Sequence, residues 1–148
     1  MSVRLEGGCA CGAVRYALSE PYDTGWCHCR VCQKTSGAPA VAFTTARAET
    51  FAWTSGADRV RVYESSKFGR RRFCGECGSL LTIEVDFQPG EIDVACATLD
   101  QPEAVPPSFH IFCKDAIAWA PIEDGLPRFD RFRPDTRGLK PGQTDPEA

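Results

Sequence analysis

Nine cysteines are the feature that most constrains what this chain can fold into. Among 148 residues they stand at Cys9, Cys11, Cys27, Cys29, Cys32, Cys74, Cys77, Cys96 and Cys113. An odd number cannot all pair internally, and the amino end lacks the apolar stretch of a secretion signal. We therefore expect reduced thiols and a cytoplasmic protein, in which cysteines bind metal or carry thiol chemistry rather than form disulfides.

The first set of cysteines combines two short motifs that lie far apart in the sequence, Cys9-Ala10-Cys11-Gly12 and Cys74-Gly75-Glu76-Cys77-Gly78. Their glycines permit tight turns, so both thiolates of each motif can converge on one point. The four sulfurs match the closed tetrahedral set of a structural zinc site. The alternatives are buried small apolar residues or a thioredoxin-like redox pair, although the βαβ context of that pair is missing.

The second set lies within six residues, Cys27-His28-Cys29-Arg30-Val31-Cys32. Cys27 and Cys29 share one face of an extended segment, while Cys29 and Cys32 meet where a helix begins. Three converging sulfurs with an exchangeable fourth position are typical of a catalytic zinc. The spacing equally allows a second, closed structural site. Its fourth ligand would be one of Cys96, Cys113, His28 and His110.

The remaining candidate residues have structural explanations. Cys96 and Cys113 stand in apolar surroundings and are expected to be inert core residues. His28 alternates with its cysteine neighbours, so we expect it to face away from them and form hydrogen bonds. A positively charged cluster comprises Lys67, Arg70, Arg71 and Arg72. It could bind a carboxylate-bearing substrate, but such runs are usually solvated faces.

Charge and hydropathy narrow the possible partners. The chain has 17 Lys and Arg against 20 Asp and Glu, a net charge of −3, which is the wrong sign for coating nucleic acid or anionic lipid. No apolar run approaches the ~20 residues of a membrane span. We expect neither a nucleic-acid nor a membrane partner, and the sequence leaves the oligomeric state unknown.

Hydrophobic periodicity predicts a mainly β fold with an antiparallel sheet. Short apolar or alternating stretches occupy residues 14–18, 40–44, 58–63, 71–73, 79–85 and 91–97. One short helix is expected over residues 30–36, because Gly37 and Pro39 follow it. Residues 108–120 are expected to return to the core. We predict one domain over residues 1–133 and a mobile tail over 134–148, which is nearly devoid of apolar residues.

These motifs together resemble a known family. The resemblance rests on residues 7–16, 27–38 and 73–79 and, more weakly, on 98–100, 110–111, 119 and 125–129, and it covers roughly residues 4–130. The sequence is similar to the glutathione-dependent formaldehyde-activating enzymes, a family that includes centromere protein V. The resemblance implies a zinc-binding β-tent fold. It also implies two zinc ions per chain, a structural one on Cys9, Cys11, Cys74 and Cys77 and an active-site one on Cys27, Cys29 and Cys32.

The activity that the resemblance implies is the joining of formaldehyde and glutathione into S-hydroxymethylglutathione, which is classed in reverse as a carbon–sulfur lyase reaction. A thiol attacks an aldehyde as thiolate, and an open zinc could bind that thiol or polarise the aldehyde oxygen. Three thiolates leave zinc with a net charge of −1, which favours holding the thiol. Cys27, Cys29 and Cys32 are thus the predicted catalytic set, with a small-molecule thiol and aldehyde as partners. The alternative is a non-catalytic, zinc-stabilised protein-binding module.

Overall fold

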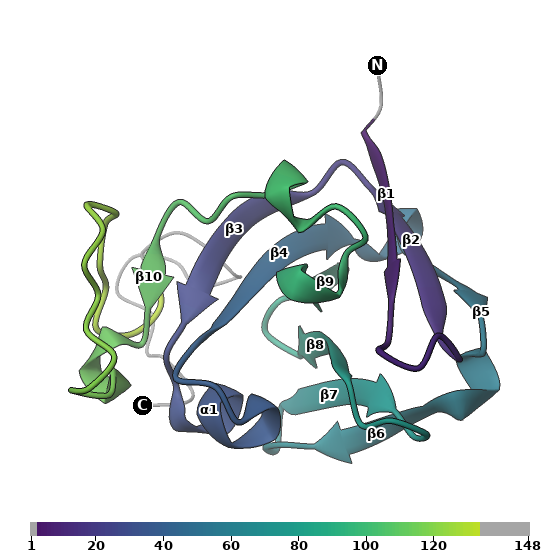
Figure 1. Cartoon of the computed structure of the whole chain (residues 1–148), viewed down its shortest axis with the longest axis horizontal. Coiled ribbons are helices and arrows are strands. Elements are labelled where there is room, and N and C mark those ends of the chain that lie inside the picture. The colour runs from purple at the N-terminus through teal and green to yellow at the C-terminus, as the bar shows by residue number, and fades with distance from the viewer. Residues whose placement is uncertain (1–2, 134–148) are drawn as a thin grey trace.

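The computed structural model describes residues 3–133, and this part of the chain is mainly β (Figure 1). Its strands are β1 (Arg4–Gly8), β2 (Arg15–Ser19), β3 (Tyr22–Cys27), β4 (Val41–Arg47), β5 (Ala52–Ser55), β6 (Val60–Glu64), β7 (Gly69–Cys74), β8 (Leu80–Val85), β9 (Glu91–Ala95) and β10 (His110–Ile111). The one α-helix of residues 3–133 is α1 (Arg30–Ser36). The expected mainly β class with one short helix is confirmed.

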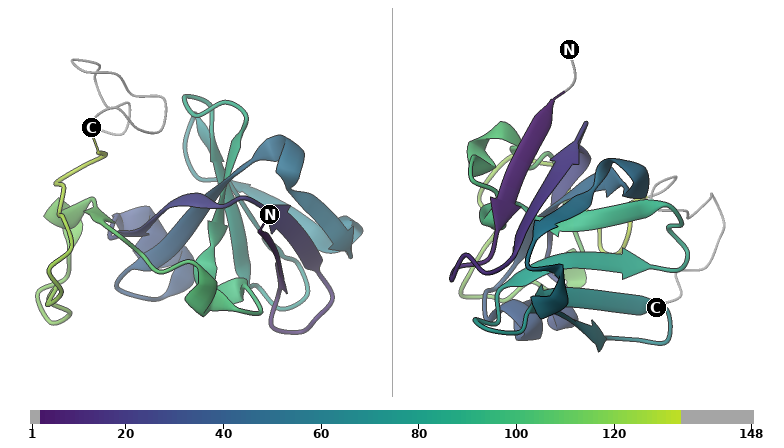
Figure 2. Two further views of the ribbon diagram at one scale, coloured as in Figure 1. Left: turned by 90° about the horizontal axis from the view of Figure 1, so that it is seen from above. Right: turned by 90° about the vertical axis from the view of Figure 1, so that its right-hand side faces the viewer.

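The strands form two open sheets. The smaller has the order β1-β2-β5, and the larger has the order β10-β3-β4-β9-β8-β7-β6. Every pairing between two of these strands is antiparallel except that of β10 with β3, which is parallel. In the right-hand view of Figure 2, the purple β1 is steeply inclined to the teal strands of the larger sheet. The two sheets therefore cross rather than continue one another.

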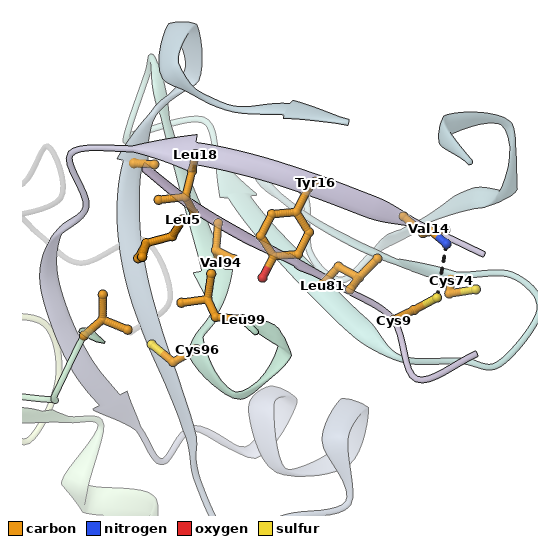
Figure 3. Close-up of a cluster of buried hydrophobic side chains, with 12 residues drawn as sticks. Leu5, Cys9, Val14, Tyr16, Leu18, Cys74, Leu81, Val94, Cys96 and Leu99 are labelled. Atoms are coloured by element: carbon orange, nitrogen blue, oxygen red, sulfur yellow. Dashed lines mark hydrogen bonds between the residues drawn. The ribbon is translucent and has the colours of Figure 1, made fainter. Parts of the chain in front are cut away.

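A hydrophobic core fills the space between the two sheets. Leu5, Tyr16 and Leu18 of the smaller sheet face Leu81 and Val94 of the larger one (Figure 3). All five are at most 8% exposed. Burying side chains of this size stabilises the fold by about 1.5–3 kcal/mol each, so this contact fixes the smaller sheet on the larger.

A second hydrophobic cluster lies beside α1. It is built from Phe43, Ile83, Phe109, Ile111 and Phe112, together with the three cysteines of the second set. The parallel pairing of β10 with β3 places Ile111 opposite Cys27, which brings a segment more than eighty residues away against the cysteine loop. The cysteine loop is therefore part of a packed interior.

Several expectations can be compared with the structure directly. The helix spans the expected residues, with Cys29 as its N-cap and Gly37 in the left-handed region at its end. Each of the expected extended stretches overlaps a strand. The expectation for residues 108–120 holds only for residues 109–112, which are buried. It is wrong further on, since Trp119 is 74% exposed. The predicted tail, 134–148, lies outside the described residues.

The α-helix in the described part of the chain is too short to cross a lipid bilayer, so no membrane-spanning helix is found there.

Two candidate metal centres

The first candidate centre joins the turns of both sheets. Cys9 and Cys11 lie in the β1–β2 turn, Cys74 ends β7, and Cys77 lies in the β7–β8 turn. Their sulfurs all lie within 4.8 Å of one another. The Cys9–Cys11 and Cys11–Cys74 sulfur distances are 3.6 and 3.9 Å. A tetrahedral zinc with Zn–S bonds of about 2.3 Å has sulfurs about 3.8 Å apart, so the set fits a closed zinc site.

Two glycines shape the turns of this centre. Gly12 and Gly78 each follow the second cysteine of their motif, with φ of 82° and 79°, a region in which other residues are strained. The Gly12 N–H donates to the Cys9 carbonyl at 3.2 Å, and the Gly78 N–H donates to the Cys74 carbonyl at 2.8 Å. The first motif thus closes a turn with a bond to the residue three positions before the glycine, and the second with a bond to the residue four positions before it.

Backbone N–H groups stabilise the two buried sulfurs of this centre. The Val14 N–H donates to Cys9 Sγ at 3.2 Å, the dashed line of Figure 3. The Glu76 N–H donates to Cys74 Sγ at 3.3 Å. Burial acts to raise the pKa of Cys9, but its hydrogen bonds lower that pKa overall, which favours the thiolate that binds metal.

Ser79 links the two motifs through its hydroxyl. Its Oγ accepts from the Ala10 N–H at 3.0 Å and lies 3.2 Å from Cys77 Sγ. Since Oγ already accepts from Ala10, its own hydrogen is available to Cys77. Hydrogen bonds from the Ser79 hydroxyl and backbone lower the pKa of Cys77 to about 5. Sequence reasoning did not identify Ser79, although it follows the second motif directly.

The second candidate centre lies at the end of β3 and the start of α1. Cys27, Cys29 and Cys32 are 9%, 8% and 1% exposed, and their sulfurs lie within 4.8 Å of one another. The Cys32 N–H donates to Cys29 Sγ at 3.2 Å, the N-cap bond of the helix. Within residues 3–133, no Cys, His, Asp or Glu joins this set as a fourth member. The predicted convergence of three sulfurs is therefore present.

The three thiols do not ionise independently. Hydrogen bonds from Cys27 and Cys32 lower the pKa of Cys29, while hydrogen bonding to Cys29 raises the pKa of Cys27 well above its usual range. One thiolate is thus stabilised at the expense of its neighbours. A state with three thiolates requires a cation among the sulfurs, and this donor set fits zinc.

Arg71 supplies a positive charge beside this set. Its side chain is buried, and its Nη1 and Nη2 each donate to Cys32 Sγ at 3.5 Å. The expectation of a solvated charged face is wrong for this residue. It fits Arg70 better, whose ion pair with Asp86 is largely exposed, while Arg72 forms a half-buried ion pair with Glu84. The alternation of side chains along β7 is the signal that could have separated Arg71 from them.

A cavity of about 50 Å³ adjoins the three sulfurs. Its lining includes the three cysteines, Arg71, Gln88 and Asp93, among apolar side chains such as Phe43 and Phe112. Gln88 donates through Nε2 to Asp93 Oδ1 at 3.3 Å. Because the cavity is lined by sulfurs, a cation, a carboxylate and an amide among apolar side chains, it can bind a small polar molecule next to the cysteines.

His28 faces away from the sulfurs and forms a hydrogen-bonded chain. Its Nε2 lies 2.8 Å from His110 Nδ1, and His110 Nε2 lies 3.0 Å from both carboxylate oxygens of Asp124. Gln33 adds a second link, donating to the His28 carbonyl at 2.7 Å and to the Asp115 carbonyl at 3.0 Å. The expected hydrogen-bonding role of His28 is confirmed. These contacts tie the cysteine loop to the segment after β10.

Cys96 and Cys113 join neither candidate centre. Cys96 is 5% exposed in the core between the sheets, and burial raises its pKa to about 12, so it is an inert thiol. Cys113 is only partly buried, which corrects the expectation of a core position for it. Neither cysteine is close enough to complete the three-sulfur set.

Comparisons with known proteins give a consistent result. The model of a family described as glutathione-dependent formaldehyde-activating enzyme matches residues 4–115. A Halomonas elongata protein that carries this family's name is 28% identical over 127 residues, which cover 80% of this chain and 81% of that protein. A Schizosaccharomyces pombe protein named as an uncharacterized lyase is 34% identical over 77 residues, 51% of this chain and 54% of that protein.

A solved structure is similar as well. The crystal structure of a Rhodobacter sphaeroides protein is 28% identical and superposes with a TM-score of 0.56. The match covers 65% of this chain and 88% of that one. The similarity therefore extends from the sequence to the arrangement of the strands.

Proposed function

The chain belongs to the glutathione-dependent formaldehyde-activating enzyme family, and we propose that it is a zinc-dependent carbon–sulfur lyase-type enzyme. It joins a thiol, glutathione or a similar one, to a small aldehyde such as formaldehyde and forms an S-hydroxymethyl adduct. Cys27, Cys29 and Cys32 are its active-site ligands. Cys9, Cys11, Cys74 and Cys77 hold a second, structural zinc.

One observation carries this proposal. Three buried sulfurs converge beside a small cavity, and within residues 3–133 no fourth ligand completes the set. A structural zinc has four protein ligands, whereas a catalytic zinc keeps one position for a water or substrate. The contrast with the four-sulfur centre of the same chain supports an open site here.

The three-sulfur centre would use its metal to activate the incoming thiol. Zinc held by Cys27, Cys29 and Cys32 would lower the pKa of an incoming thiol and hold it as thiolate. The protein's part is to exclude water and fix the sulfurs, through the N-cap bond at Cys29 and the apolar side chains of the second cluster. A dry, rigid surrounding strengthens the electrostatic interactions on which such a site depends.

The reaction needs no oxidant or reductant. The thiol loses its proton, its sulfur electron pair forms a bond to the aldehyde carbon, and the carbonyl π electrons move to oxygen. That oxygen then takes up one proton, so one S–H bond is replaced by one O–H bond. A free thiol with a pKa of about 8.5 is only a few per cent ionised at neutral pH, so stabilising its thiolate accelerates the addition.

The size of the cavity limits which reactant enters it. About 50 Å³ accommodates a few water-sized groups, which suits a one-carbon aldehyde and excludes a tripeptide thiol. Two larger surface hollows of about 410 and 320 Å³ share Thr35, Gly78 and Leu80 in their linings, and the second also touches Arg71. We expect the body of the thiol to remain on this outer side while its sulfur reaches the cysteines.

The test is the rate of adduct formation above the spontaneous reaction. NMR exchange spectroscopy of formaldehyde with glutathione, and then with a panel of other thiols and small aldehydes, should show acceleration by the zinc-loaded protein. Cys29→Ser should reduce the rate to the uncatalysed background. Cys113→Ser is the matched control, because it removes a thiol that joins neither centre, and it should keep the full rate.

If the native protein matches the background for every aldehyde and thiol tried while both zinc ions are bound, the chain is not this enzyme. The same metal content without turnover would instead support a zinc-stabilised protein-binding module.

A further inference from the structure

Arg71 is a buried cation without a carboxylate partner. Its side chain lies on β7 at 6% exposure, and among residues 3–133 its side-chain hydrogen bonds go to Cys32 Sγ and, at 3.4 Å, to Thr35 Oγ1. No ion pair of the described residues includes it, whereas Arg70 and Arg72 both have acidic partners. Burying an unpaired guanidinium is costly unless anions supply the compensating charge. Here the anions are the thiolates and whatever binds beside them.

Two buried polar atoms of the same cavity lack partners. Arg71 Nε, a donor, and Gln88 Oε1, an acceptor, have none among the described residues. Gln88 is 3% exposed, and both side chains line the cavity that the three sulfurs adjoin. A buried polar atom without a partner costs about 1–3 kcal/mol, so such pairs are typical of a site that is completed by a ligand. The ligand must offer an acceptor to Arg71 and a donor to Gln88.

We propose that Arg71 binds the aldehyde oxygen in this cavity and stabilises the negative charge that develops on it when the thiolate adds. This inference rests on the proposed function and adds a catalytic residue to it. When the carbon–sulfur bond forms, the carbonyl electron pair moves to oxygen, and the guanidinium faces that charge in a dry site. After the oxygen takes up a proton, its new O–H group donates to Gln88 Oε1. The oxygen would thus first accept a hydrogen bond from Arg71 Nε and then, once protonated, donate one to Gln88 Oε1.

Direct binding of a small oxyanion tests this role without any turnover. Formate has the size of formaldehyde and carries a negative oxygen, and its affinity for the zinc-loaded protein can be measured by calorimetry or by ¹³C NMR line broadening. Arg71→Met should weaken formate binding by at least about tenfold, since it removes a charge-assisted donor. Arg70→Met is the matched control on the same strand, and it should bind formate as the native protein does. Equal binding by both variants, or no binding by the native protein, overturns the proposal.

Kinetics provide the second measurement. Arg71→Met should lower kcat about 100-fold, the usual effect of removing an oxyanion donor, with a smaller change in the KM for the thiol. Zinc content measured in parallel must remain at the native value, so that the loss is not a loss of metal. An unchanged kcat at native zinc content overturns the role of Arg71, whereas a native protein without turnover overturns the proposed function and leaves the formate result to decide the anion site.

A variant that keeps the charge covers the case in which Arg71→Met does not fold. Arg71→Lys retains one positive charge but loses the paired N–H groups, and it should bind formate at least about threefold more weakly than Arg70→Lys. Equal affinities in this pair would also overturn the proposal.

Discussion

The two cysteine sets of this chain differ in sulfur count, exposure and surroundings. The four-sulfur centre lies at turns, where Cys11 and Cys77 are exposed and main-chain N–H groups donate to the buried sulfurs. The three-sulfur centre is buried, adjoins a cavity and is contacted by a guanidinium. The same ligand atom is thus placed in one four-sulfur and one three-sulfur arrangement, and the two arrangements have different surroundings.

The centres also differ in what they hold together. The four-sulfur centre connects the β1–β2 turn of the smaller sheet with the β7–β8 turn of the larger one, and Cys11 and Cys74 are 63 residues apart. The three-sulfur centre spans only residues 27–32. By loop-closure entropy, constraining the longer segment stabilises the fold by roughly 2 kcal/mol more. Loss of the first centre should therefore cost more stability than loss of the second.

The largest effect is expected from Cys77→Ser. Metal binding contributes about 10–16 kcal/mol in small structural zinc sites, so losing one sulfur should unfold or aggregate the protein at ambient temperature. Cys77 is a cleaner choice than Cys74, because its side chain is exposed and its removal leaves no core cavity. Thermal melts and zinc content, with Cys113→Ser beside them, measure the effect. A native melting temperature with two zinc ions bound would show that the four-sulfur assignment is wrong.

A smaller loss of stability is expected from Cys29→Ser. The variant should stay folded, because the centre between the sheets remains intact, and its melting temperature should fall far less than that of Cys77→Ser. Its far-ultraviolet circular dichroism should match that of the native protein. Unfolding of both variants to the same extent would remove the distinction between a structural and a reactive centre.

Mild chelation should separate the centres without mutation. An open three-thiolate site loses zinc more readily than a closed four-thiolate site, because its free position admits the chelator. Elemental analysis should find about two zinc ions in the reduced protein and about one after brief chelation, with the fold retained. Simultaneous loss of both ions would mean that the chelator reaches the two centres equally well, so that they do not divide into an open and a closed site.

Much of the fold and of both cysteine sets could be predicted from the sequence, because the signals are local. The helix over 30–36 has its cap and its terminating Gly37 within a few residues, and both metal motifs have their glycines beside them. Strand β3 was missed for a non-local reason. Its Gly25 packs against the Phe109 ring, so closely that a Cβ would lie 2.2 Å from that ring, and nothing near residue 25 indicates this contact.

The roles of His110 and Arg71 were left open in the sequence for the same reason. His110 is positioned by His28, 82 residues away, and by Asp124. Arg71 meets Cys32 across 39 residues, and its positively charged neighbours hide it in the sequence. Side-chain alternation separates Arg71 from Arg70 and Arg72, but only the packing of β7 against α1 shows which of the two faces points inward.

The smallest effect concerns the outer contacts of the closed centre. Ser79→Ala removes the hydroxyl that connects Cys77 Sγ to the Ala10 N–H, so one hydrogen bond to a ligand and one to the opposite turn are lost. A net loss of about 1 kcal/mol, or roughly 2–4 °C in melting temperature, is expected, together with faster release of the tightly held zinc. The more loosely held zinc should be retained as in the native protein, because the three-sulfur centre is not touched. Ser55→Ala, on the exposed side of β5, is the control for removing a surface hydroxyl. If Ser79→Ala instead releases the loosely held zinc while the tightly held zinc stays in place, the two centres are coupled and the division of roles between them does not hold.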